Sequence, residues 1–178
     1  MEHGICSFTG HRRIAAAHAP YMADLLARSV GYAYSEGCRD FMTGGALGFD
    51  TLAADAVLHL RETHPDVRLI LCLPCRNQDV DWSESQRRKY REIAERADEV
   101  IYVSDRYTPT CMRERNLVLA ERCDILIAYV GYSASGSAQT ARMAERLGRR
   151  VYNIYPSLDE KSRQNAPLPD RGGISREE

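Results

Sequence analysis

Short apolar runs alternate with longer amphipathic segments along most of the chain, and this alternation constrains the fold more than any other feature. Parallel strands cannot be joined by tight turns, so strands that alternate with helices are typical of a parallel sheet. We therefore expect an α/β fold, a three-layer sandwich with a mostly parallel sheet of about six strands. The runs with strand character are residues 4–8, 39–43, 67–73, 99–103, 124–130 and 150–155.

Burial and helix patterns add detail to this prediction. The runs 67–73 and 124–130 are the most continuously apolar, so we place them centrally in the sheet. The helix over 83–97 carries the basic run Arg87, Arg88, Lys89 and Arg91, but glutamates interleave with it, so we interpret it as a solvated face and not as a nucleic-acid stripe. Helices are expected over residues 20–36, 48–63, 83–97, 112–122 and 136–147.

The end of the chain differs from the rest in composition. Residues 157–178 contain almost no large apolar side chains and cannot build a core. We therefore predict one domain over residues 1–156 and a disordered tail over residues 157–178.

The charge balance excludes several classes of partner. Lys and Arg number 24 and Asp and Glu number 25, a net charge of -1, which gives no general attraction for nucleic acid or anionic lipid. No apolar run approaches the roughly 20 residues of a membrane span, and the first residues do not resemble a signal peptide. We expect a cytoplasmic protein whose six cysteines are thiols, with neither a membrane nor a nucleic acid as partner.

Three glycine-bearing turns directly follow predicted strands. Ligands of an open parallel sheet bind at the carboxyl ends of its strands, where the following helices present unpaired N–H groups. These turns and the start of the 112–122 helix are therefore the candidate ligand site. The turns supply Thr9, Gly10, His11 and Arg12, then Gly44, Gly45, Gly48 and Asp50, then Ser135, Gly136, Ser137 and Thr140, and the helix adds Arg113 and Asn116.

These residues have both functional and structural interpretations. Arg12 is suited to clamp a phosphate, although it can equally be a surface arginine. Asp50 would repel phosphate, so we expect it to accept ribose hydroxyls or to cap local N–H groups. His11 is a candidate acid or base without an identifiable partner. The glycines can be required only for the backbone angles of a tight strand-to-helix connection, and Ser135 can be the N-cap of a helix.

A metal site is not expected. Cys72 and Cys75 have C-x-x-C spacing, but Cys72 ends an apolar strand and the sequence has no second C-x-x-C. We therefore interpret both cysteines as structural and expect no bound metal.

The turns together resemble the SLOG superfamily, a Rossmann-like group that includes the DNA-processing protein DprA and the cytokinin-activating LOG enzymes. The likeness is closest to the YpsA-like family. It rests on SFTGHR at 7–12, TGGALGFD at 43–50, MRERN at 112–116, CDILIA at 123–128 and SGSAQTA at 135–141, with Pro74, Gln78 and Trp82 between them. The resemblance implies a Rossmann-like fold and adds Gln78 to the candidate site.

What the resemblance implies about function is binding of a nucleotide or a nucleotide-derived small molecule, dinucleotides included, by a sensor or processing module. One alternative is a nucleotide hydrolase or phosphoribohydrolase-like enzyme in which His11 or Asp50 moves the proton. The chain lacks the second glycine and the carboxylate of the LOG pattern P-G-G-x-G-T-x-x-E, which argues against LOG-type hydrolysis.

Two further hypotheses remain open. A DprA-like nucleic-acid accessory protein is disfavoured because only four arginines, at positions 12, 13, 113 and 115, lie near the predicted site. A partner-regulated cell-division factor is compatible with the resemblance alone. The sequence leaves open the ligand, any reaction and whether the chain forms a homo-oligomer.

Overall fold

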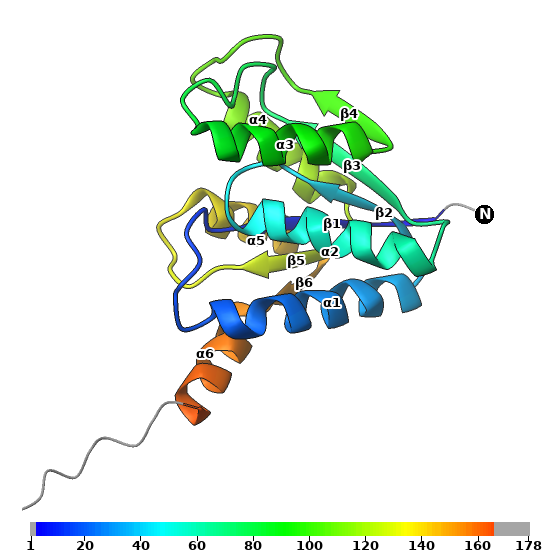
Figure 1. Cartoon of the computed structure of the whole chain (residues 1–178), viewed down its shortest axis with the longest axis vertical. Helices are drawn as coiled ribbons and strands as arrows, with labels where there is room; N and C mark the ends of the chain where they lie inside the picture. Colours follow the sequence, from blue (N-terminus) through cyan, green and yellow to red (C-terminus); the bar gives the residue numbers. More distant parts are fainter. Residues whose placement is uncertain (1–2, 166–178) are drawn as a thin grey trace, which may run out of the picture.

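The computed structural model describes residues 3–165 and shows a six-stranded parallel sheet between two layers of helices (Figure 1). The strand order is β4-β3-β2-β1-β5-β6, and all five neighbouring pairs are parallel. The predicted fold class is therefore confirmed. The strands are β1 (Gly4–Gly10), β2 (Cys38–Thr43), β3 (Arg68–Leu73), β4 (Glu99–Tyr102), β5 (Ile125–Tyr129) and β6 (Arg150–Asn153).

The handedness of the connections decides which helix covers which face. From β1 the chain steps outward to β4, and after β4 it returns to β5, beside β1, and continues to β6 on the other side. Right-handed crossovers in opposite directions put their helices on opposite faces. Accordingly α1 (Ala19–Ser35), α2 (Phe49–Thr63) and α3 (Glu84–Arg96) cover one face, and α4 (Cys111–Arg122) and α5 (Gly136–Arg146) cover the other (Figure 1).

Each interior strand contributes side chains alternately to the cores on the two faces of the sheet. In β3, Leu69, Leu71 and Leu73 belong to the large core under α1 and α2, whereas Ile70 and Cys72 pack on the α4 side. Successive side chains of a strand point to opposite faces, so a strand covered on both faces is apolar at nearly every position.

The two most apolar strands are not the central ones. β3 and β5 are buried along almost their whole length, as expected, but the centre of the sheet is formed by β2 and β1. Every strand between the two edge strands is covered by helices on both faces. An apolar sequence therefore distinguishes interior strands from edge strands, but it does not show the order of the interior strands.

The chain continues in ordered structure beyond the predicted domain end. Residues 157–164, predicted to be disordered, belong to helix α6 (Tyr155–Gln164). Leu158 is fully buried, and Asp159 lies 2.9 Å from Nε2 of His18, whose Nδ1 lies 2.9 Å from the hydroxyl of Tyr129. The buried side chain of Leu158 and the hydrogen-bonded group of Asp159, His18 and Tyr129 hold this helix against the domain. The composition of the segment does not show these contacts. The rest of the predicted tail, residues 166–178, lies outside the described residues.

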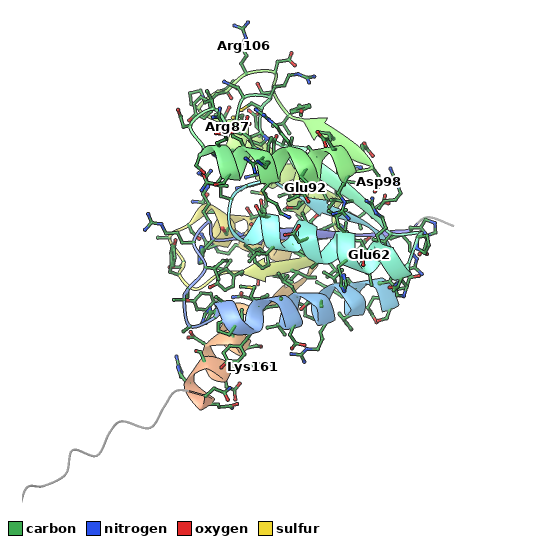
Figure 2. The ribbon with its side chains drawn as sticks, viewed as in Figure 1. Glu62, Arg87, Glu92, Asp98, Arg106 and Lys161 are labelled. Carbon is green, nitrogen blue, oxygen red and sulfur yellow. The ribbon has the colours of Figure 1, made fainter. Side chains whose placement is uncertain are left out.

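The outer face of α3 carries charges of both signs. Arg87 and Glu92 lie on this helix (Figure 2), and Nζ of Lys89 lies 2.8 Å from Asp55 of α2 and 4.0 Å from Glu92. Mixed charges of this kind fit the predicted solvated face. Among residues 3–165, no helix is long and apolar enough to span a membrane.

Replacing Leu158 by Ala tests whether α6 is part of the folded domain. Because Leu158 is fully buried, we expect its truncation to lower the free energy of unfolding by about 2 to 5 kcal/mol in urea titrations. Replacing the exposed neighbour Ser157 by Ala should change it by less than about 0.5 kcal/mol. Equal, negligible effects of the two substitutions would show that α6 does not dock in solution.

Candidate functional site

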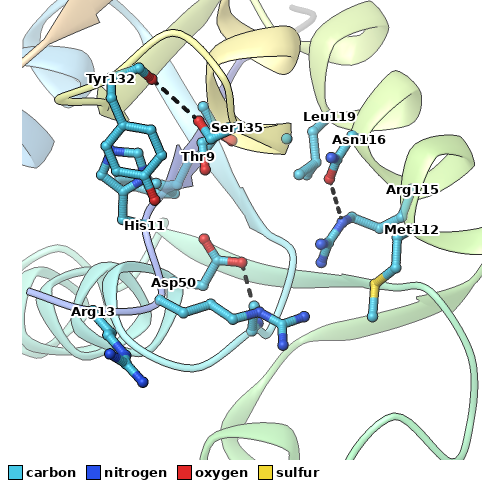
Figure 3. Close-up of a pocket in the computed structure, with 16 residues that line it drawn as sticks. Thr9, His11, Arg13, Asp50, Met112, Arg115, Asn116, Leu119, Tyr132 and Ser135 are labelled. Atoms are coloured by element: carbon cyan, nitrogen blue, oxygen red, sulfur yellow. Dashed lines mark hydrogen bonds between the residues drawn. The ribbon is translucent and has the colours of Figure 1, made fainter.

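A cavity of about 590 Å³ opens at the carboxyl ends of β1 and β5 (Figure 3). These strands are neighbours, yet their connections leave toward opposite faces, so the two loops diverge and leave a crevice between them. The cavity is lined by Phe8, Thr9, Gly10, His11, Arg12, Arg13, Ala46, Asp50, Met112, Arg115, Asn116, Leu119, Tyr132, Ser135, Gly136 and Ser137.

The structure brings most of the predicted site residues to this cavity. Those that line it are Thr9, Gly10, His11, Arg12, Asp50, Asn116, Ser135, Gly136 and Ser137. The remaining predicted residues do not line it: Gly44, Gly45, Gly48, Gln78, Arg113 and Thr140.

The glycine turn between β2 and α2 packs against the protein itself. Gly48 has a φ of 79°, and a Cβ there would collide with the carbonyl oxygen of Arg12. A Cβ at Gly44 would collide with the guanidinium of Arg115 and would lie 2.8 Å from Oδ2 of Asp50. Gln78 supports the turn by donating a hydrogen bond from Nε2 to the carbonyl of Gly45 (3.2 Å). The glycines thus create the space into which other residues of the site reach.

Asp50 is a buried carboxylate in the first turn of α2. Its side chain accepts a hydrogen bond from the backbone N–H of Ala46 at 3.2 Å, and the residue is only 5% exposed. Burial raises the pKa of the Asp50 carboxyl, and the positive charges of Arg115 and Arg12 offset part of that increase. Burial therefore destabilises the ionised form of Asp50. A carboxylate has two acceptor oxygens, so Asp50 can also accept hydrogen bonds from a ligand.

Arg115 is a buried cation whose guanidinium faces the same hollow. It is 6% exposed, donates from Nη1 to the carbonyl of Gly44, and donates from Nε to Oδ1 of Asn116 at 2.8 Å. Among the described residues, no carboxylate oxygen lies within 4.0 Å of its nitrogens. Figure 3 shows Asp50 and Arg115 reaching the cavity from α2 and α4.

Arg113 was the arginine of this helix predicted to bind the ligand, whereas Arg115 was placed near the site without being assigned to it. Arg113 is exposed, whereas Cys111, Arg115 and Leu119 form the buried stripe of α4 at a spacing of four residues. The usable signal was an arginine at an apolar position of a helical repeat. An arginine rarely occupies such a position unless something pairs with its charge.

His11 holds the ring of Tyr132 in place by stacking, and its basic nitrogen, Nε2, is already occupied by a hydrogen bond. Its Nε2 accepts a hydrogen bond from the N–H of Gly131 at 2.8 Å, which fixes the proton of the neutral ring on Nδ1. Burial lowers the pKa of His11, which favours this neutral form. The ring stacks on Tyr132 with centroids 4.1 Å apart and planes within 4°. Tyr132, which sequence reasoning missed, is 60% exposed and offers a flat surface at the cavity.

The start of α5 supplies hydrogen-bond donors. Oγ of Ser135 caps the helix by accepting from the N–H of Ala138 at 3.1 Å. Within the described residues, the N–H groups of Gly136 and Ser137 donate no hydrogen bond, as is usual for the first turn of a helix. Thr140 is fully buried and donates to the carbonyl of Gly136 at 2.9 Å, so it supports the helix from behind.

None of the six cysteines lines this cavity. All six are buried and unpaired, including Cys72 and Cys75. No group of three or more His, Cys, Asp or Glu side chains among residues 3–165 could hold a metal ion.

Comparison with known proteins agrees with the SLOG resemblance. The family model YpsA, described as the YspA SLOG family, matches residues 10–155. The uncharacterized SPbeta prophage-derived protein YoqJ of Bacillus subtilis is 29% identical over 133 residues, which cover 67% of this chain and 78% of YoqJ. A UPF0398 protein of Halalkalibacterium halodurans is 34% identical over 104 residues, 57% of this chain. That match covers 55% of the relative, so the chain spans about half of its length.

Among solved structures, DprA from Helicobacter pylori shares the fold, with a TM-score of 0.62 and 21% identity over 89% of this chain and 72% of that one. That structure is described by its unique single-stranded DNA binding mode. The family match over residues 10–155 includes the loops that form the cavity. The chain belongs to the YpsA family of SLOG proteins.

Proposed function

We propose that this protein binds a phosphorylated nucleotide in the cavity between the β1 and β5 loops. The observation that carries the proposal is Arg115, a 6% exposed cation with no carboxylate within 4.0 Å among the described residues. Burying an unpaired charge is costly, and an anionic ligand would relieve that cost.

The other residues of the cavity complement the remaining parts of a nucleotide. The N–H groups of Gly136 and Ser137 can bind phosphate oxygens together with Arg12. Asp50 can accept hydrogen bonds from ribose hydroxyls, as acidic residues do in other Rossmann-like sites. The exposed ring of Tyr132 can stack on a base.

Replacing Arg12 by Ala should weaken AMP binding by about 10- to 150-fold, because a hydrogen bond to a charged group contributes roughly 1.5 to 3 kcal/mol. Arg12 is exposed, so the fold should survive the change. Arg12→Lys should recover part of the affinity, since it keeps the charge and loses the planar fork. Isothermal titration calorimetry with AMP and with adenosine provides the measurement.

Adenosine should bind the wild type and Arg12→Ala almost equally, because it has no phosphate. The matched control is Arg106→Ala, an exposed arginine in the loop between β4 and α4 (Figure 2). If AMP and adenosine lose the same affinity, Arg12 shapes the loop and is not a phosphate ligand.

Replacing Asp50 by Asn should stabilise the fold and weaken nucleotide binding. Since the folded-state pKa of Asp50 is raised, its contribution to stability is present below its unfolded-state pKa and is lost as the pH rises through the folded-state pKa. The variant should therefore melt at a higher temperature than the wild type at about pH 8, and this difference should shrink toward about pH 4. Each 1 kcal/mol gained in the free energy of unfolding raises Tm by about 2 to 4 °C in a chain of this size.

Ligand choice separates the two effects of the Asp50→Asn change. AMP should bind the variant about 10-fold more weakly, because an amide replaces a charged acceptor of the ribose hydroxyls. Dideoxy-AMP, which lacks those hydroxyls, should not lose affinity. A variant that is less stable than the wild type at about pH 8 would show that the pKa of Asp50 is not raised in the folded protein.

Single-stranded DNA is the second candidate ligand, because a DprA whose structure is described by single-stranded DNA binding has the same fold. Polynucleotides need several cations that act together, and here the cavity offers Arg12, Arg13 and Arg115. Fluorescence anisotropy with a labelled 20-nucleotide strand, competed by AMP, tests this candidate. Tight strand binding that AMP does not compete would favour it over the nucleotide proposal.

A further inference from the structure

A second cavity, of about 560 Å³, adjoins the nucleotide cavity. Arg12 and Arg13 line both cavities, so the two hollows meet at this pair of residues. The second hollow is bounded by the start of α2 and by the segment from Trp82 to Tyr90, which leads into and forms the first half of α3. None of its residues from that segment takes part in the function proposed above.

The far wall of the second cavity is aromatic. Trp82 is partly exposed and packs edge-on against Tyr90, with ring centroids 5.4 Å apart and an angle of 75° between the planes. A Cβ at Gly45 would lie 3.3 Å from Nε2 of Gln78 and 3.6 Å from Cε2 of Tyr90, so this wall packs against the glycine turn that Gln78 supports. The wall is therefore a fixed surface with a flat ring available at the cavity.

Two cationic side chains, Arg12 and Arg13, lie where the two cavities adjoin. Arg12 and Arg13 are both exposed, and no carboxylate among the described residues lies within 4.0 Å of either guanidinium. Lys89 of the second cavity is already paired with Asp55 at 2.8 Å. An unpaired cationic pair thus lies between two aromatic surfaces, Tyr132 on one side and Trp82 on the other.

We propose that the two cavities together bind a dinucleotide, two ring systems joined by a short phosphate bridge. One base stacks on Tyr132, the bridge lies at Arg12 and Arg13, and the second ring packs against Trp82. This inference rests on the proposed nucleotide site and extends it.

The sizes and charges of the cavities favour this ligand. Each cavity falls in the range of roughly 300 to 1,000 Å³ that is typical of small-molecule sites, so each can hold one nucleoside-sized lobe. The cationic pair at the junction suits a short bridge, whereas a long strand would need cations along its whole path.

The chain contains a single tryptophan, Trp82, which reports directly on the second cavity. We expect diadenosine diphosphate to quench the intrinsic tryptophan fluorescence in a saturable way and ADP, which carries the same phosphates and one base, to bind without quenching. Both ligands are titrated into the intact wild-type protein, and calorimetry measures the affinity of each in parallel.

Substitution at Trp82 extends the test. Trp82→Ala should weaken diadenosine diphosphate by about 5- to 150-fold, the usual effect of losing one base–aromatic stack, and leave ADP unchanged. Trp82→Phe should restore most of the affinity. Tyr107→Ala, at a 63% exposed aromatic outside both cavities, should change neither ligand.

Each outcome decides between the alternatives. If ADP binds and diadenosine diphosphate binds no more tightly and does not quench, the dinucleotide inference is wrong and the nucleotide site stands. If neither ligand binds, both proposals are wrong. If a single-stranded oligonucleotide quenches Trp82 and binds more tightly than diadenosine diphosphate, the two cavities belong to a nucleic-acid strand and not to a soluble dinucleotide.

Discussion

The handedness of parallel crossovers is the constraint on which the rest of this structure depends. Because β1 and β5 are neighbours whose connections cross to opposite faces, their carboxyl ends are separated by a crevice that no connection covers. The same geometry directs the start of α5 toward that crevice. The glycine turn after β2 completes the site, since Gly44 and Gly48 allow Arg115 and the Arg12 backbone to approach closely.

The energetic character of the site comes from charges that the fold holds away from water. Asp50 is buried with a raised pKa, and Arg115 is buried without a close carboxylate among the described residues. Burial of each charge costs stability, and the attraction between Asp50 and Arg115 offsets part of that cost. Buried charges of this kind are typical of functional sites. The hydrogen bonds of Arg115 to Gly44 and Asn116 fix its direction, so a ligand would meet a preorganised cation. The His11–Tyr132 stack is similarly fixed by the bond from Gly131.

The sequence predicts the sheet and several of the residues that line the cavity, because both follow from local patterns. The apolar runs define the strands, and the turns at Gly10 and Gly136 lie at the carboxyl ends of β1 and β5, as the parallel arrangement requires. What it does not reveal depends on tertiary contacts. Tyr132 looks like any loop tyrosine until His11 stacks on it, and α6 is held by Leu158 and by Asp159 through partners more than a hundred residues away. Arg115 is different, because its position in the apolar stripe of α4 was readable.

The most direct test of the proposed nucleotide site follows the arginine and amide signals of the protein in nitrogen–proton correlation NMR spectra during addition of AMP. If the account is right, the Nε–H signal of Arg115 and the amide signals of Gly136 and Ser137 shift together and saturate, and adenosine leaves them nearly unchanged. Shifts that avoid these three signals, or equal shifts with adenosine, would show that the cavity between the β1 and β5 loops does not bind the phosphate of a nucleotide.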